Sequence, residues 1–224
     1  MSKSKVIVAK DLNLGYKNEN IIENGSFSLN SGDFVFLTGA SGSGKTTLLR
    51  HLYGELKAKS GYLNIGGFDM MKISKSKLTY LRRYIGIVFQ DYKLIQEYTI
   101  AQNITLPLEI KNYSSSVIEK QLKNLLKHVK LTHKIGAYPA ELSGGEQQRV
   151  AVARAFSDNP DLILADEPTG NLDDYSSDMI WSLLKNANEV LGTTIVVVTH
   201  RIPKNMGIKY RRFNIEEGVL YEAS

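Results

Sequence analysis

The sequence predicts an α/β fold built on a largely parallel β-sheet, and two observations support that prediction. Short apolar runs typical of strands alternate with stretches of helical spacing, at residues 6–8, 34–38, 85–89, 162–165 and 194–199. Residues 162–165 and 195–198 are almost continuously apolar, as expected of central strands with both faces covered by helices. With 224 residues, the chain is long enough to bury the core of one large domain.

The remaining segments follow other patterns. Residues 11–16, 26–29 and 62–65 are typical of short strands interrupted by Gly and Asn, which favours a small antiparallel layer beside the main sheet. Strand signals disappear between residues 98 and 156, where apolar residues near helical spacing predict an amphipathic packing helix: Val117, Ile118, Leu122, Leu125, Leu126 and Val129. We expect a single domain over residues 1–224, with a core at 1–90 and 158–224 and a helical subdomain at about 91–157.

Composition excludes several classes of protein. The chain has no cysteine, so disulfides, thiolate metal sites and thiol nucleophiles are absent. No apolar run approaches the ~20 residues that span a bilayer, and the first ten residues do not resemble a secretory signal, so we expect neither membrane crossing nor export. The net charge of +5 comes from scattered lysines, without the aromatic and arginine platform of RNA-binding domains, so nucleic acid is not an expected partner.

A phosphate-binding loop is predicted directly after the strand at 34–38. Residues 39–47 read Gly-Ala-Ser-Gly-Ser-Gly-Lys-Thr-Thr and precede the apolar start of a helix, which is the pattern GxxxxGK[ST] in its strand–loop–helix context. Successive backbone N–H groups and the helix N-terminus favour a polyphosphate; Lys45 would reach its β- and γ-phosphates, and the Thr46 hydroxyl would ligate Mg²⁺. A chance match in a glycine-rich turn is the alternative. The candidate residues are Gly39, Ser41, Gly42, Ser43, Gly44, Lys45, Thr46 and Thr47.

Two carboxylates close the strand at 162–165. Because side chains alternate across a strand, Asp166 and Glu167 can serve different targets. Asp166 would face the Mg²⁺ shell and Glu167 the attacking water, one acting electrostatically and the other as general base. The alternative is a pair of solvent-exposed acids that merely end a strand.

A second anion site is predicted at residues 142–149, Leu-Ser-Gly-Gly-Glu-Gln-Gln-Arg, which lead into an apolar helix. Ser143 and the glycines that follow it, Gly144 and Gly145, lie where a helix presents unpaired N–H groups. Ser143 and Glu146 also match a capping box. The two interpretations are compatible, since a cap can also bind phosphate.

Residues 39–47, 142–149 and 162–167, in this order, resemble the Walker A, signature and Walker B motifs of ATP-binding cassette (ABC) ATPases. The signature-like segment is the most specific, because ordinary P-loop proteins lack it. Gln90 resembles the family's Q-loop glutamine, residues 171–173 its D-loop, and His200 its switch histidine. The resemblance implies a P-loop NTPase cassette with a RecA-like core, a small antiparallel β subdomain and a helical subdomain.

The same resemblance implies a division of labour among the site residues. Two cassettes would clamp two ATP molecules head to tail in an ATP-dependent homodimer, so the 143–146 segment of each chain would bind the ATP held by the other. Glu167, His200 and Gln90 would be catalytic: Glu167 polarises water, His200 holds the γ-phosphate, and Gln90 senses it. Thr46, Gln90 and Asp166 would hold Mg²⁺.

Two further nucleotide contacts follow from the resemblance. Tyr16 is similar to the aromatic residue that stacks on adenine, and Asp173 of the D-loop belongs to the same nucleotide-binding set.

Within the family, the chain most resembles the cassettes of bacterial cell division. This implies a peripheral protein at the cytoplasmic side of the inner membrane, bound to an integral membrane partner near residues 90–99, with ATP turnover controlling cell-wall hydrolases. Lipoprotein-release and efflux cassettes are the alternative within the family. Two other classes of function are disfavoured: a soluble ABC protein acting on DNA or ribosomes, because a coiled-coil insertion and a second cassette are absent, and a GTPase-type switch, because an Asn-Lys-x-Asp segment is absent.

Overall fold

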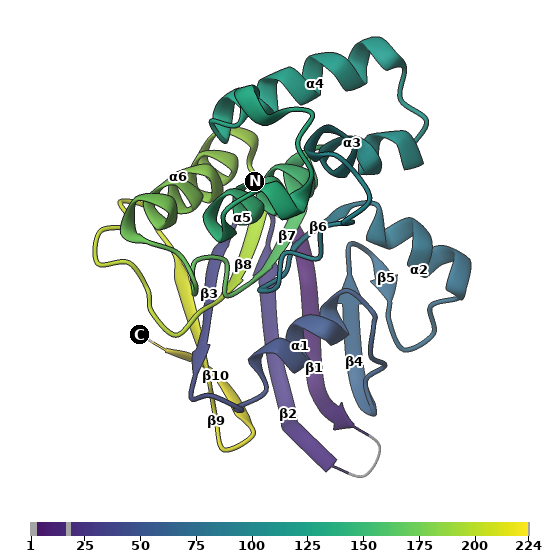
Figure 1. Cartoon of the computed structure of the whole chain (residues 1–224). Coiled ribbons are helices and arrows are strands. Elements are labelled where there is room, and N and C mark those ends of the chain that lie inside the picture. Colours follow the sequence, from purple (N-terminus) through teal and green to yellow (C-terminus); the bar gives the residue numbers. More distant parts are fainter. Residues whose placement is uncertain (1–3, 17–18, 224) are drawn as a thin grey trace.

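The computed structural model describes residues 4–16 and 19–223, and Figure 1 shows two β-sheets with most of the helices gathered at one side. The larger sheet has the strand order β10-β9-β3-β8-β7-β6. Neighbouring strands are parallel except β9 and β10, which form an antiparallel hairpin. The largely parallel α/β sheet is therefore confirmed. Its strands are β3 (Phe34–Gly39), β6 (Ile85–Val88), β7 (Leu162–Asp166), β8 (Thr194–Val198), β9 (Arg211–Glu216) and β10 (Val219–Ala223).

The smaller sheet is antiparallel and has the order β2-β1-β4-β5. It consists of β1 (Lys5–Tyr16), β2 (Glu19–Asn30), β4 (Ser60–Ile65) and β5 (Phe68–Asp69). Residues 6–8, expected among the strands of the parallel sheet, lie instead in β1, where Ile7 pairs with Leu29 and Ile65. That expectation was wrong because an apolar run of three residues carries no period that assigns it to one sheet or the other.

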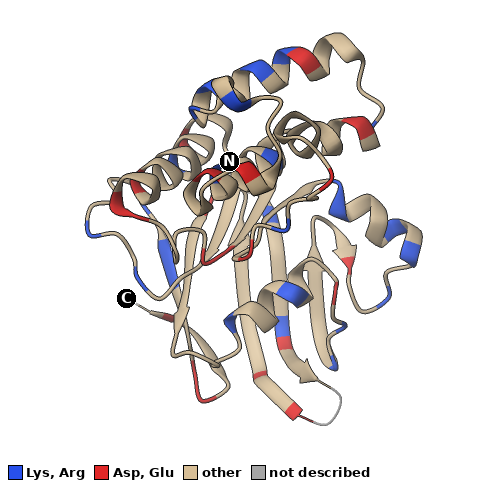
Figure 2. Ribbon diagram, viewed as in Figure 1, with Lys and Arg blue, Asp and Glu red and all other residues tan. Residues whose placement is uncertain are grey.

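The helices are α1 (Lys45–Leu52), α2 (Lys75–Arg82), α3 (Ile100–Ile110), α4 (Ser115–His128), α5 (Gly144–Phe156) and α6 (Asp174–Leu191), with 3₁₀ turns at Thr132–Lys134 and Pro139–Glu141. The amphipathic helix expected near residues 117–129 is α4. It buries Leu125 and Leu126, but Val117 in its first turn is 44% exposed. Lysines and arginines are dispersed over several elements, α4 among them (Figure 2). None of the described helices is long and apolar enough to cross a bilayer.

The larger sheet separates two apolar cores. Side chains alternate along β3, so Phe34 and Phe36 face one core while Val35 and Leu37 face the other. The first core contains side chains of α3, α4, α5 and α6, and the second contains side chains of α1, α2 and the smaller sheet. Helices therefore lie on both faces of this sheet, as expected, but on the second face α1 shares the covering with the antiparallel strands.

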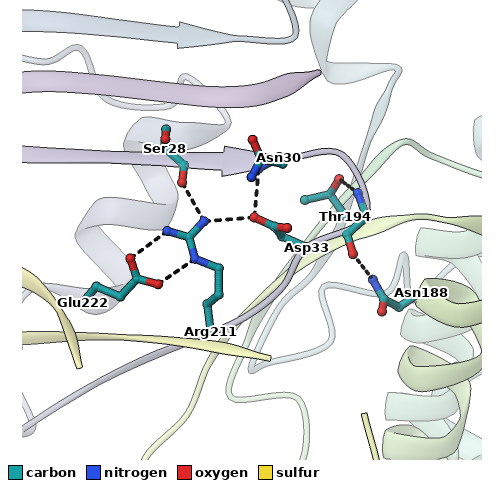
Figure 3. A network of polar contacts seen from close by, with 8 residues as sticks. Ser28, Asn30, Asp33, Asn188, Thr194, Arg211 and Glu222 are labelled. Carbon is teal, nitrogen blue, oxygen red and sulfur yellow. Dashed lines mark hydrogen bonds and ion pairs between the residues drawn. The ribbon is translucent and has the colours of Figure 1, made fainter. Parts of the chain in front are cut away.

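The hairpin β9–β10 is anchored through Arg211, whose surroundings are drawn in Figure 3. Its guanidinium donates to Ser28 O at 2.8 Å and to Asp33 Oδ2 at 2.9 Å, and it pairs with both carboxylate oxygens of Glu222 at 2.7 and 2.8 Å. Asp33 Oδ2 also accepts from the Asn30 backbone N–H. The chain after residue 199 therefore returns to the sheet and is fixed against the end of β2.

Candidate active site

The loop between β3 and α1 has a backbone shape that depends on glycine. Gly42 and Gly44 have φ values of +77° and +103°, in the left-handed region that L side chains rarely adopt. A Cβ atom on Gly44 would also lie 2.3 Å from the side chain of Ile21 on β2. Since α1 begins at Lys45, directly after this loop, the unpaired N–H groups of its first turn are next to the loop. Loop and helix start together form a site suited to an anion.

Lys45 is the buried cation of this loop. The residue is 6% exposed, and its Nζ donates to Gly39 O at 2.9 Å and Ala40 O at 2.7 Å. Burial lowers the pKa of Lys45, an effect that the nearby charges of Glu167 and Asp166 oppose. Because its hydrogen-bond partners are carbonyl oxygens, this buried ammonium gains further stabilisation from an anionic ligand.

Asp166 ends β7 next to the first turn of α1. Thr46 Oγ1 donates to Asp166 Oδ1 at 3.1 Å, and burial raises the pKa of Asp166. A hydroxyl and a carboxylate in contact are hard oxygen donors of the kind that Mg²⁺ selects. No group of three His, Cys, Asp or Glu side chains suited to a metal occurs in residues 4–16 and 19–223. The two oxygens fit Mg²⁺ that shares its coordination with phosphates and water, as this ion commonly does.

Glu167 has a backbone conformation that costs about 1–3 kcal/mol for a non-glycine residue, with φ at +43°. Its N–H donates to Val198 O at 2.9 Å, and its side chain is 12% exposed. Oε1 accepts no hydrogen bond within the described residues, although His200 Nε2 lies 3.3 Å away. Burial raises the pKa of Glu167, while the charge of His200 acts in the opposite direction. A carboxylate that lines the cavity and whose pKa is raised by burial has the properties of a general base.

A cavity of about 390 Å³ brings most of the predicted residues together. Among those expected, it is lined by Ser41, Gly42, Gly44, Lys45, Thr46, Thr47, Gln90, Glu167 and His200. Gly39 and Ser43 line a neighbouring cavity of about 620 Å³ that also reaches His200 and Arg212. Asp166 is not in the lining of the first cavity and reaches it through Thr46.

The signature-like segment lies apart from this cavity, at the start of α5. Ser143 is the N-cap: its Oγ accepts from the Glu146 N–H at 3.3 Å, and Glu146 Oε2 accepts from the Ser143 N–H at 2.8 Å. Lys134 Nζ also donates to Glu146 Oε2, at 3.0 Å. Burial opposes ionisation of Glu146, but these hydrogen bonds hold its pKa below the usual range. The capping box is therefore present. Ser143, Gly144, Gly145 and Glu146 do not line the cavity, and their part in anion binding stays a prediction.

Tyr16 and Asp173 also lie outside the cavity lining. Tyr16 is at the end of β1, 41% exposed, and its hydroxyl accepts from Arg50 Nη1 at 2.9 Å. Asp173 is the N-cap of α6: its two carboxylate oxygens accept from the Ser176 N–H and from Ser176 Oγ, both at 2.9 Å. Their expected contacts with nucleotide likewise stay predictions.

The cavity contains residues that the sequence prediction left out of the site, namely Gly170, Asn171 and Val198. Gly170 and Asn171 belong to the run Pro-Thr-Gly-Asn that follows Glu167. Such a run is a turn signal, and a turn directly after a catalytic strand end could have been included on that ground.

Comparison with known protein families and sequences identifies the family of this chain. Residues 22–170 match the family model described as ABC transporter. This chain is an ABC ATPase cassette. It is 43% identical over 193 residues to the cell division ATP-binding protein FtsE of Streptococcus pneumoniae serotype 2, covering 86% of this chain and 84% of that one. It is 41% identical over 200 residues to the lipoprotein-releasing system ATP-binding protein LolD of Buchnera aphidicola, with coverages of 87% and 88%.

Solved structures of other ABC cassettes have the same fold as this chain. The dimeric post-hydrolysis state of the cassette MJ0796, bound to ADP and Pi, superposes with a TM-score of 0.88 at 36% identity, covering 97% of this chain and 98% of that one. As a member of this family the chain binds and hydrolyses ATP, and the cavity beside Lys45 is where the phosphate-binding loop lies.

Proposed function

We propose that this cassette is the ATPase subunit of an FtsE-like membrane complex that couples ATP hydrolysis, through an integral membrane partner of the FtsX type, to cell-wall hydrolases in division. The observation that supports it most is the similarity to FtsE over most of the chain, together with the site around Lys45, Asp166 and Glu167. The protein would bind peripherally at the cytoplasmic face of the cell membrane. No nucleic acid is needed for this function.

In this proposal the loop N–H groups and Lys45 bind the β- and γ-phosphates. Thr46, Asp166 and Gln90 would hold Mg²⁺, which supplies charge neutralisation on the phosphates when bound. Glu167 takes a proton from the attacking water, and His200 Nε2, 3.3 Å from the buried Glu167 Oε1, keeps the carboxylate aimed at the cavity. Each role follows from a side chain that lines the cavity or contacts one that does.

The catalytic unit would be a homodimer. The 143–146 segment does not line the cavity of its own chain, so within one chain its free N–H groups have no nucleotide to bind. A head-to-tail pair would place this segment of one copy over the phosphate loop of the other. The dimeric MJ0796 cassettes support such a pairing.

The membrane partner would dock in a cleft of about 350 Å³ between α2, α3 and α5. Its floor is largely apolar, and Arg82, Arg83 and Arg154 line it, so an amphipathic segment with an acidic residue fits its chemistry. Arg154 donates to Tyr92 O and Lys93 O, both at 2.8 Å, which connects the cleft to the expected docking segment at 90–99. Lys93 is paired with Asp91 at 2.6 Å, so a change at Lys93 would also disturb that ion pair. Arg83→Glu is therefore the better test of docking.

The deciding experiment is affinity purification of tagged Glu167→Gln protein from its native membranes with Mg·ATP, followed by mass spectrometry. Glu167→Gln is expected to retain ATP, stop turnover and stabilise a nucleotide-bound dimer. Recovery of an FtsX-like membrane protein with cell-wall hydrolases supports the proposal, and Arg83→Glu should reduce that recovery. A wholly soluble partner, or a monomeric and fully active Glu167→Gln protein, would contradict it.

The similarity to LolD favours a second candidate, the ATPase subunit of a lipoprotein-release transporter, with efflux cassettes of the MacB type as a further relative of that class. The same purification separates the two: a lipoprotein-release or efflux permease among the recovered proteins would move the function from division to transport.

A further inference from the structure

Helix α5 carries a buried side-chain amide that the site described above does not use. Gln148 is 1% exposed, and its Nε2 donates to Pro168 O at 2.8 Å. Its Oε1 is also buried and accepts no hydrogen bond within the described residues. Burying an amide that is only half satisfied is unfavourable, so the bond to Pro168 is kept at a cost to stability.

Pro168 directly follows Glu167 and has no N–H to donate, so its carbonyl is the one backbone group through which this residue can form a hydrogen bond, and Gln148 donates to it. The Glu167 carbonyl itself accepts from the Gly170 N–H at 3.1 Å, within the same loop. On the other side, the Glu167 N–H donates to Val198 O at 2.9 Å. Glu167 therefore lies between two anchors, one on β8 and one on α5. Its left-handed backbone persists only where surrounding contacts determine it, and these anchors are such contacts.

The second anchor comes from the helix that begins with the signature-like glycines. Gln148 lies about one helical turn after Gly144, the first residue of α5. One hydrogen bond thus connects Glu167 to the helix whose cap is Ser143.

We propose that Gln148 is a positioning residue for ATP hydrolysis: by holding Pro168 O it keeps the Glu167 carboxylate aimed into the cavity. This inference rests on the proposed role of Glu167 as general base. Gln148 itself does not line the cavity and acts through the backbone of the loop after β7.

Two variants remove the contact in different ways. Gln148→Met keeps the length of the side chain but lacks the donor, and Gln148→Asn keeps the amide but is one methylene too short to reach Pro168 O. The matched control is Asn188→Leu, which removes another side-chain amide that holds backbone carbonyls, those of Gly32 and Thr193 at 3.0 and 2.8 Å. Turnover, the KM for ATP and the melting temperature are measured for each protein.

Both Gln148 variants are expected to lower kcat about tenfold with the KM for ATP unchanged within twofold, because a displaced general base affects the chemical step more than binding. In a Glu167→Gln background, Gln148→Met should cause no further loss of the residual rate. Asn188→Leu should lower only the melting temperature.

Wild-type kcat in both Gln148 variants would overturn the inference. An equal fall of kcat in Asn188→Leu, or failure of both Gln148 variants to fold, would also overturn it, because either result would assign the Gln148 amide to fold stability. Failure of the proposed function itself has a different signature, since Glu167→Gln would then keep its turnover.

Discussion

Charged side chains gather at both ends of β3, and the two clusters are built in opposite ways. Before the strand, the Arg211 cluster (Arg211, Asp33 and Glu222) pairs a guanidinium with two carboxylates. After it, the Lys45 cluster (Lys45, Asp166 and Glu167) makes no direct ion pair between its cation and its acids, and burial disfavours the charged form of each member. The first cluster stabilises the fold, whereas the second is held ready for a ligand.

The largest effect that would test this contrast is expected from Lys45→Met. Removing the cation should weaken ATP binding by about 100-fold or more, because a charge-assisted contact to phosphate is lost in a buried site. The melting temperature without nucleotide should stay the same or rise, since a desolvated charge is removed. Titration with a fluorescent ATP analogue and thermal unfolding check both points, with the exposed Lys120→Met as control. A strongly destabilised Lys45→Met protein would contradict the contrast.

Arg211→Met should show the converse behaviour. Loss of the guanidinium leaves Asp33 largely buried without its cation, so the free energy of unfolding should fall by about 2 kcal/mol, between the values for surface and buried pairs. ATP affinity at a temperature where the protein is folded should match that of the wild type. Urea unfolding and ATP titration measure the two quantities. A lower ATP affinity with an unchanged free energy of unfolding would show that Arg211 serves nucleotide binding and not fold stability.

Asp166→Asn tests whether, within the Lys45 cluster, Asp166 serves metal binding while Lys45 serves phosphate binding. The Mg²⁺ concentration for half-maximal turnover should rise about tenfold, because a neutral amide is a weaker ligand for a hard cation than a carboxylate. ATP binding in the presence of a chelator should not weaken. Turnover measured over a range of Mg²⁺ concentrations tests this, with Glu189→Gln on the exposed face of α6 as control. An unchanged Mg²⁺ requirement would remove Asp166 from the metal site.

The smallest effect is a pH dependence in the Arg211 cluster. Hydrogen bonds from Arg211 hold the pKa of Glu222 below its usual range, so its stabilising contribution is present above the pKa of the unfolded state and is lost as pH falls through the folded-state pKa. Glu222→Gln should therefore cost about 0.5 kcal/mol at pH 7 and nothing at strongly acidic pH. Urea unfolding from pH 7 down to pH 3 measures the difference, and a constant difference would show that charge is not its cause.

The Lys45 cluster could be predicted from sequence, and the Arg211 cluster could not. The residues around Lys45 form contiguous motifs, because a phosphate loop and a strand-ending acid need specific neighbours in the chain. Arg211, Asp33 and Glu222 come from three distant segments, and no local pattern reports their pairing. The same reason explains why Gln148 was missed, since its partner Pro168 is twenty positions away.

The strands show a similar limit. The central strands β7 and β8 could be recognised from their continuous apolar runs. β9 was not predicted, although Phe213 and Ile215 alternate with polar residues as in a strand with one buried face. The two arginines at its start resemble a surface segment unless the carboxylates that pair with one of them are known.

The contact between Gly44 and Ile21 means that the phosphate loop rests on a strand of the other sheet. Ile21 belongs to β2, which pairs with the strand that ends at Tyr16. Ile21, which lies against the phosphate loop, and Tyr16, which is predicted to contact the base, are thus on paired strands. A shift of this strand pair would move both contacts of a bound nucleotide together. If Tyr16 contacts the base as predicted, the antiparallel layer sets the distance between the base and the phosphates of the nucleotide.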